Sequence, residues 1–185
     1  MDINNKKAKR RKENGSVTLE ASIALTIFIF LMLFMYSFLV VFEARNHVAH
    51  TMLAASNSLG FDSFATETVK ESSAQELLYK LYGKMADSNG TYIDTSKWYD
   101  DEKKIQQTVK QRFLYYLSGG NEAEADRILK QLNIVGGFDG LDFSGCKVDG
   151  DDLYIEIKYT LDYEFKVFAL DTMEMSHSCC SKLWK

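Results

Sequence analysis

The clearest hydrophobic pattern of the chain lies within its first 45 residues. From Ile23 to Phe42 the sequence reads IALTIFIFLMLFMYSFLVVF, 20 residues without a charge, in which Thr26, Tyr36 and Ser37 are the polar side chains. A helix of this length rises about 30 Å, which is the thickness of the hydrocarbon core of a bilayer. A core helix of a soluble domain would carry a polar face. The pattern therefore predicts a membrane-spanning helix.

The helical pattern continues beyond the apolar run. The stretch RNHVAHTMLAASNSLG contains no breaker, and one face of it carries Val48, Met52, Ala55 and Leu59. This spacing is that of an amphipathic helix, whose apolar stripe must pack against a head domain or a neighbouring molecule. Glycine commonly follows the last residue of a helix, so we predict that the resulting stalk ends at Gly60.

Three further segments have a helical period. The first is residues 66–86, followed by a turn-rich loop at 87–96. The second begins after Asp100 and ends at Gly119-Gly120, with four side chains predicted to point inward: Ile105, Val109, Phe113 and Tyr116. Asn121 is expected to N-cap a third helix through Leu132, with Glu124 at the capping-box position.

The period changes to two near the end of the chain. Five apolar residues alternate with polar ones and predict a half-buried antiparallel strand: Leu153, Ile155, Ile157, Tyr159 and Leu161. The turn GDD at 150–152 pairs this strand back onto DFSGCKV. A second strand is predicted at Phe165, Val167 and Ala169, and a last one at Met173, Met175, His177 and Cys179.

Together these elements predict an α+β chain. A long N-terminal transmembrane helix extends into a stalk and is followed by a head domain of helices and a small C-terminal antiparallel sheet. The expected domains are a basic cytoplasmic leader at 1–15, the transmembrane and stalk helix at 16–60, and an extracytoplasmic head at 61–185. The absence of proline from all 185 residues permits long helices and argues against a proline-rich linker.

The charge distribution sets the predicted orientation. Six of the 22 lysines and arginines lie in residues 6–12, directly before the apolar run, whereas residues 16–185 carry a net charge of −8. Basic residues flank membrane helices on the cytoplasmic side, so the N-terminus is predicted to be cytoplasmic and the chain from about residue 43 to lie outside. The acidic remainder offers no basic face, which argues against nucleic-acid binding.

The junction between leader and apolar run carries an unusual acidic residue. It reads Gly15-Ser16-Val17-Thr18-Leu19-Glu20. A glutamate at the membrane edge is costly and often marks a functional contact. The alternative is that Glu20 is solvated at headgroup depth and stabilises the first helical turn through the helix dipole.

A basic leader that ends in glycine, a glutamate at the fifth position after it and about 20 apolar residues resemble the type IV prepilin signal. The stretch GSVTLEASIAL is similar to TadE/TadG-like proteins of the tight-adherence (Tad) pilus machinery. The resemblance implies that a prepilin peptidase cuts between Gly15 and Ser16, at a glycine that leaves the bond accessible in an extended conformation. It also implies that Glu20 contacts a neighbouring subunit. Ser16 and Ala21 depart from the residues of major pilins, which implies a minor pilin or pseudopilin.

Other chemistry finds little support in the sequence. Cys146, Cys179 and Cys180 fall in the part predicted to lie outside, where Cys146 could bridge to one of the vicinal pair or all three could stay reduced. Cys179 and Cys180 are neighbours in a predicted strand, so their side chains point to opposite faces and cannot share a metal ion. His47 and His50 have no third ligand nearby. We therefore expect no metal and no cofactor. No phosphate loop, nucleophile elbow or HExxH motif occurs, so we expect no enzymatic activity.

The sequence thus favours a minor pilin or pseudopilin-like component of a Tad-type assembly, single-pass in the cell membrane. Its expected partners are the membrane, a prepilin peptidase and other pilin or pilus-assembly subunits. The alternative is an unprocessed, signal-anchored surface protein whose outer domain binds a ligand or partner. An anchored enzyme ranks last, because only exposed carboxylates support it.

Overall fold

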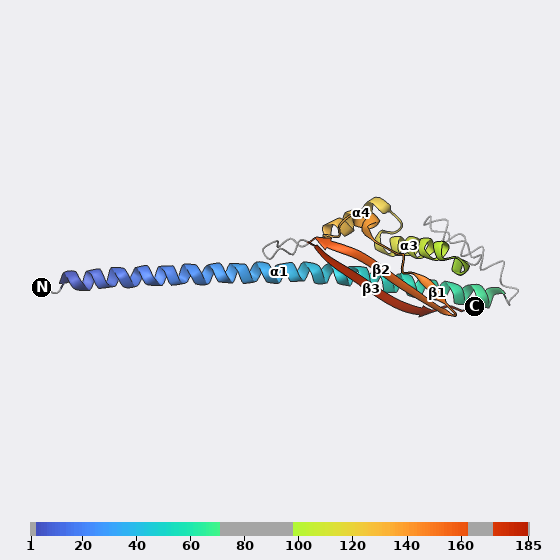
Figure 1. Ribbon diagram of the computed structural model, residues 1–185, viewed down its shortest axis with the longest axis horizontal. Helices are drawn as coiled ribbons and strands as arrows, with labels where there is room; N and C mark the ends of the chain where they lie inside the picture. Colours follow the sequence, from blue (N-terminus) through green and yellow to red (C-terminus); the bar gives the residue numbers. More distant parts are fainter. Residues whose placement is uncertain (1–2, 71–97, 163–171, 185) are drawn as a thin grey trace. The chain divides into compact units, whose positions relative to one another are not determined.

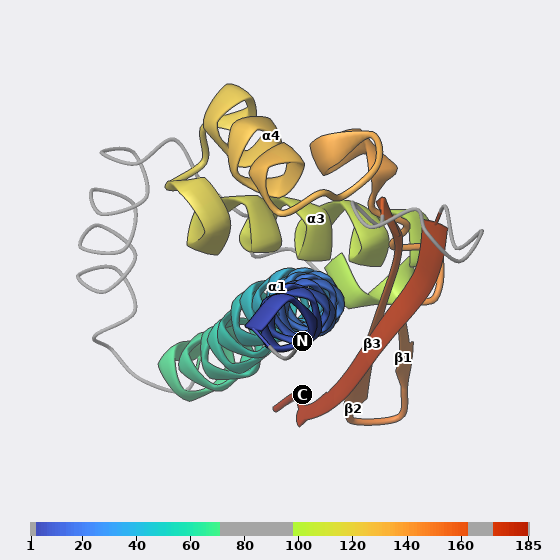
Figure 2. The same ribbon diagram turned by 90° about the vertical axis from the view of Figure 1, so that its left-hand side faces the viewer.

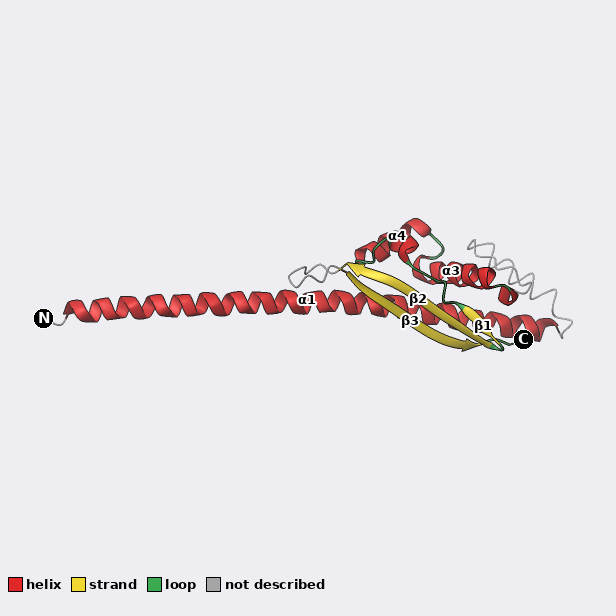
Figure 3. Cartoon of the chain, viewed as in Figure 1, coloured by secondary structure: helices red, strands yellow, loops and turns green. Residues whose placement is uncertain are grey.

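The computed structural model describes residues 3–70, 98–162 and 172–184. It is an α+β chain with a long apolar N-terminal helix, as predicted (Figures 1 and 3). In chain order its elements are α1 (Ile3–Lys70), the 3-10 helix η1 (Trp98–Asp100), α3 (Glu102–Ser118), α4 (Glu122–Gln131), the 3-10 helix η2 (Gly137–Gly140), β1 (Lys147–Asp149), β2 (Asp152–Asp162) and β3 (Thr172–Lys182). The contacts divide the chain into two units, Met1–Leu39 and Val40–Lys185.

The sheet of the second unit is antiparallel, with the strand order β1-β2-β3. Its central strand, β2, buries every second side chain, and the five apolar residues predicted to face inward are all buried. β1 pairs with β2 across the predicted turn, with Val148 opposite Leu153. β3 pairs with β2 over its whole length, from Asp152 opposite Lys182 to Asp162 opposite Thr172. The alternating pattern of this region therefore predicted the observed strands.

The C-terminal part of α1 is the centre of the core of the second unit. In Figure 2 this part of the helix has α3 on one side and the sheet on the other. The predicted stripe is buried in full, and Ala44 extends it toward the N-terminus: Ala44, Val48, Met52, Ala55 and Leu59. Of these, Ala44, Val48, Met52 and Leu59 pack in one cluster with residues of α3, α4 and the sheet. Because apolar burial is the main stabilising term in folding, this stretch of α1 is an integral part of the unit.

The prediction that the helix ends at Gly60 is wrong, since α1 continues to Lys70. A Cβ atom at Gly60 would lie 3.0 Å from the carbonyl oxygen of Lys182. Two hydrogen bonds fix this approach, from Ser181 Oγ to the Ser56 carbonyl (3.3 Å) and from the Trp184 amide to Ser63 Oγ (2.9 Å). The glycine therefore allows close packing of β3 on the helix, a requirement that no local pattern in α1 reveals.

Helix α3 begins and ends as its sequence predicts. The Asp101 side chain accepts a hydrogen bond from the Lys103 amide at the N-cap, and Gly119 ends the helix with a left-handed φ of 67°. Three of the four predicted inward residues are buried, but Tyr116 is 45% exposed. The buried face repeats every four residues, so that Leu117 follows Phe113 on the core side and Tyr116 turns to solvent.

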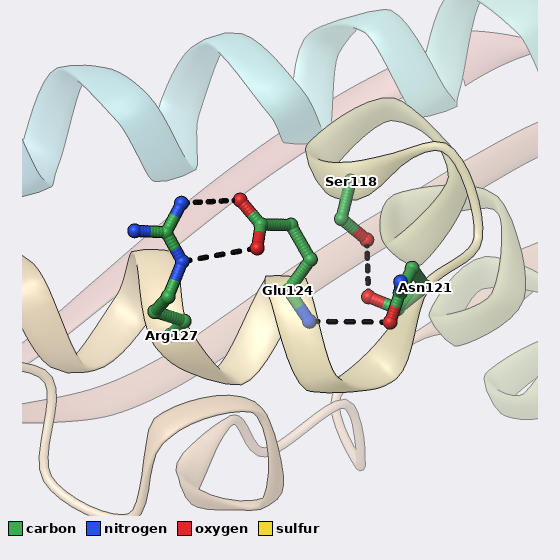
Figure 4. A network of polar contacts seen from close by, with 4 residues as sticks. All are labelled: Ser118, Asn121, Glu124 and Arg127. Atoms are coloured by element: carbon green, nitrogen blue, oxygen red, sulfur yellow. Dashed lines mark hydrogen bonds and ion pairs between the residues drawn. The ribbon is translucent and has the colours of Figure 1, made fainter.

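Helix α4 has half of the predicted capping box. Asn121 Oδ1 accepts a hydrogen bond from the Glu124 amide at 3.2 Å, as an N-cap should (Figure 4). The Glu124 carboxylate does not return to the Asn121 amide, which donates to the Ser118 carbonyl. It binds the Arg127 guanidinium through two hydrogen bonds instead. A charged partner one turn away thus replaces the backbone contact of the box.

Some predictions fall on other parts of the chain. The strand at residues 165–169, the loop at 87–96 and the predicted helix at 66–86 beyond residue 70 lie outside the described residues.

Candidate functional site

The predicted processing residues lie inside a helix. Gly15 and Ser16 both belong to α1, where the sequence predicted an extended scissile bond. The helix continues through this single glycine because the residues on both sides of it are helical. Glycine in a helix interior lowers helix stability by about 1 kcal/mol relative to alanine. A peptidase that cuts here must therefore unwind α1 locally, at the residue where unwinding costs least.

From Ile23 to Leu39 the exposed surface of α1 is almost entirely apolar. The large side chains of Ile23, Phe28 and Phe34 are exposed, together with their apolar neighbours. The helix contains an 18-residue window with a mean hydropathy of 2.6, of which 6% is buried. By length and composition α1 is able to cross a membrane, a property that it shares with signal sequences.

A shallow groove of about 780 Å³ runs along the same part of α1. Six residues line it: Thr18, Leu19, Ser22, Ile23, Thr26 and Ile27. The Ser22 and Thr26 hydroxyls donate to the carbonyls of Thr18 and Ser22, both at 2.8 Å. Their hydrogen-bonding capacity is thus used within the helix, and small residues at this spacing let a second helix approach closely. Sequence reasoning missed the groove, although the spacing of four was visible.

Glu20 is exposed. At 100° per residue it stands about 160° from the centre of the Thr18–Ser22–Thr26 stripe, but about 60° from Ile23 and about 20° from Ile27, which also line the groove. Glu20 therefore lies toward the Ile23 and Ile27 edge of the groove.

The three cysteines are free. Cys146 is buried beside β1 and directs its thiol at the Glu156 carbonyl, 3.5 Å away. Cys179 and Cys180 lie on β3, opposite Ile155 and Tyr154 of β2. The structure shows no bond between Cys146 and either of them.

We expect the cysteines to react with maleimide at very different rates. Burial raises the pKa of Cys146 to about 11, which leaves on the order of one hundredth of the thiolate of an ordinary cysteine at neutral pH. Cys180 is exposed and should be modified first. Intact mass after timed labelling checks this order, with Cys180→Ser as the control that should lose the fast label. Equal rates at Cys146 and Cys180 would contradict the described burial.

A hydrogen-bonded pair of rings lies on the inner face of the sheet. The Tyr159 hydroxyl and His177 Nε2 share a hydrogen bond of 3.1 Å, and the two rings are stacked with centroids 5.9 Å apart. Burial raises the pKa of Tyr159 to about 12 against the opposing charge of Arg45. Burial, and then the charge of Arg45, lower the pKa of His177. Burial and this charge therefore favour the neutral imidazole of His177.

A polar cluster joins α1 to α3. The guanidinium of Arg112 donates to Ser58 Oγ at 2.6 Å and forms an ion pair with Asp62. Its Nε is buried and has no hydrogen-bond partner among the described residues. The cluster fixes the register of the two helices rather than forming a pocket.

Known proteins provide no template for these arrangements, since no family model, no curated protein and no solved structure matches the chain. Within the described ranges, no three His, Cys, Asp or Glu side chains are placed to hold a metal ion, and neither His47 nor His50 enters such a group. The candidate sites are therefore the junction with Glu20 and the groove in the first unit, and the Tyr159–His177 pair in the second.

Proposed function

We propose that this protein is a minor pilin or pseudopilin-like component of a Tad-type pilus or secretion assembly. It is anchored by α1, with its N-terminus cytoplasmic and the second unit outside the membrane, and it is cleaved between Gly15 and Ser16. The observation that carries the proposal is the junction itself, a basic leader with Gly15 and then Glu20 at the start of an apolar run. The exposed apolar surface of α1 supports it, because a helix of this kind needs lipid or other helices around it.

Cleavage at this position would create a charge pair that the precursor lacks. The new α-amino group would lie on Ser16, four residues before Glu20. In a low-dielectric setting, a buried carboxylate needs such a partner, and pairing across two subunits would set the stagger of packed helices. The leader peptide must be removed first, which makes processing the switch from precursor to packed subunit.

The test is processing of the protein in membranes that contain a prepilin peptidase. The wild-type chain should begin at Ser16, whereas Gly15→Leu should retain its leader, because a bulky side chain blocks the approach of the peptidase to the scissile bond. Intact mass and N-terminal sequencing give the result. Asn5→Leu, a bulky change within the leader, serves as the control and should be processed normally.

The same preparation separates this proposal from the alternative. Glu20→Ala should be processed but should recover fewer neighbouring subunits after crosslinking. An intact leader on the wild-type chain, together with unchanged crosslinking of Glu20→Ala, would instead indicate an unprocessed anchored surface protein. Normal processing of Gly15→Leu would also contradict the proposal.

A further inference from the structure

We propose that the outer edge of β3 binds an extended segment of a different protein, which adds a strand to the sheet. The segment carries a basic residue opposite Glu174 and apolar residues beside Met173 and Met175. The inference rests on the membrane anchoring of the proposed function and is independent of cleavage at Gly15. Its basis is the backbone pattern, the composition and the direction of β3.

The outer edge of β3 presents unpaired backbone groups. The order β1-β2-β3 makes β3 an edge strand, and its register with β2 is continuous over 11 residues (Figure 1). The Leu183 amide donates to the Asp151 carbonyl, so by alternation the odd-numbered residues of β3 bond to β2. The even-numbered residues direct their N–H and C=O groups away from the sheet. Between Glu174 and Cys180 these groups have no backbone partner among the described residues.

The open stretch lacks the features that protect natural edge strands from pairing, such as proline, a β-bulge or a charged side chain. Residues 175–181 contain no Asp, Glu, Lys, Arg or Pro, and the register with β2 shows no bulge. The exposed side chains of this stretch are small: Ser176, Ser178 and Cys180. Beyond them the edge is closed, because the Lys182 carbonyl lies against Gly60 of α1.

Charge and apolar surface at the start of β3 define the segment that binds. Glu174 is exposed and has no ion pair within the described ranges. Lys182, the basic residue of β3, is paired with Asp152 at 3.1 Å. Met173 is 39% exposed, and Met175 is only partly buried against the core. A basic residue opposite Glu174 and apolar residues over the adaptable methionine side chains are therefore complementary to this edge.

Antiparallel pairing with a second copy conflicts with the membrane anchor. The two-fold axis of such a pair is perpendicular to the sheet and reverses every direction in the partner. Within the second unit α1 and β3 run the same way, because Ser181 contacts Ser56 and Trp184 contacts Ser63. The membrane-near end of one α1 segment would lie beside the far end of the other, so the two copies could not share one membrane.

Parallel pairing of two copies fails on register. In a parallel ladder, a residue that directs its backbone groups at the partner lies opposite one that directs them away. A two-fold axis along the strands would place each residue of β3 opposite itself, so that outward residues would meet outward residues. With both symmetric pairings of β3 excluded, the occupant is an extended segment of another protein, bound by strand addition.

The test is photo-crosslinking of the full chain in the membranes of the cells that produce it. Ser176→p-benzoylphenylalanine places the probe on the open edge, and Tyr116→p-benzoylphenylalanine places it on the exposed side of α3 as a reference. The probe at Ser176 should give an adduct with a different protein that the probe at Tyr116 does not give. The crosslinked peptide, sequenced by mass spectrometry, should alternate apolar and polar residues and contain a lysine or arginine.

Two further substitutions in the Ser176 probe chain show whether the adduct depends on the edge. Ser178→Pro removes an outward N–H and leaves the bonds to β2, so the yield should fall about tenfold, whereas Ser178→Ala keeps the N–H and the yield. Glu174→Lys should also lower the yield, through charge repulsion and without a change to the backbone. Protection of Cys146 from maleimide verifies that the sheet is intact, and Glu174→Lys decides the matter if Ser178→Pro loses that protection.

An adduct between two copies of this chain, or no adduct at Ser176, would overturn the proposal. So would an adduct whose yield is unchanged in Glu174→Lys and in a folded Ser178→Pro chain. Capture of another protein supports the proposal only together with the losses in these variants. The N-terminus of the same sample tests the proposed function separately: an uncleaved leader with the adduct would overturn only the pilus proposal, and a Ser16 N-terminus without it would overturn only strand addition.

Discussion

Replacing Phe113 with alanine is expected to lower the free energy of unfolding by about 3–5 kcal/mol, the usual cost of removing a fully buried phenylalanine. Phe113 is 0% exposed, and its ring meets that of Phe143 edge to face at 5.7 Å. It lies on α3 in the same buried cluster as the stripe of α1. The substitution therefore opens a cavity at the centre of the second unit, which the surrounding elements can fill only in part.

The matched control for this substitution is Tyr116→Ala on the same helix. Because the ring of Tyr116 is exposed, its removal should lower the free energy of unfolding by no more than about 0.5 kcal/mol. Urea denaturation of the full chain in nanodiscs, followed through the fluorescence of the buried Trp98, compares the two variants. Similar losses for Phe113→Ala and Tyr116→Ala would mean that α3 is rotated relative to the described packing.

The second large effect is expected for Gly140→Ala. A Cβ atom at this position would lie 1.9 Å from the carbonyl oxygen of Val135, so part of the backbone must move. Val135 is itself bound to β2, because its amide donates to the Thr160 carbonyl at 2.9 Å. We expect a destabilisation of about 3 kcal/mol, the upper end of the range for overpacking.

Gly119→Ala is the comparison for Gly140→Ala. Gly119 has a left-handed φ of 67°, but a Cβ atom there would meet nothing within 4 Å. Gly119→Ala should lower the free energy of unfolding by about 1 kcal/mol, because backbone strain is its one cost. Denaturation midpoints of the two variants measure the difference, and a Gly119→Ala variant less stable than Gly140→Ala would contradict the described contact with Val135.

The fold could be predicted where each residue's environment is set by its near neighbours. The alternation of Leu153, Ile155 and Ile157 is enough to define β2, since a strand exposes its two faces in turn. Asn121 was recognisable as a cap because the bond it accepts is three residues away. In each case the physical cause lies within a few residues along the chain.

Predictions failed where a distant segment decides the outcome. Gly60 has the composition of a helix end, but its role is set by Lys182, which is 122 positions away. Tyr116 fits an apolar face by type, yet Leu117 is the residue that the core accepts. Neither the role of Gly60 nor the burial of Leu117 in place of Tyr116 can be predicted without knowing what packs against the helix.

The candidate sites divide in the same way. The groove at Thr18, Ser22 and Thr26 is local, and its spacing was available from the sequence. The pair of Tyr159 and His177 comes from two strands, so only the folded chain brings it together. The sequence places both residues in alternating strands, and neither pattern indicates that the two side chains pair.

The burial of α1 by the last strand has a consequence for biogenesis. The stripe from Ala44 to Leu59 is synthesised early, whereas β3 and the buried Leu183, which cover the same core, come at the end of the chain. The hydrogen bond from Ser181 to Ser56 spans 125 positions. Contacts of such separation form late and leave apolar surface uncovered until then. A chain stalled before β3 should therefore be a substrate for chaperones and quality-control proteases, even when α1 has already formed.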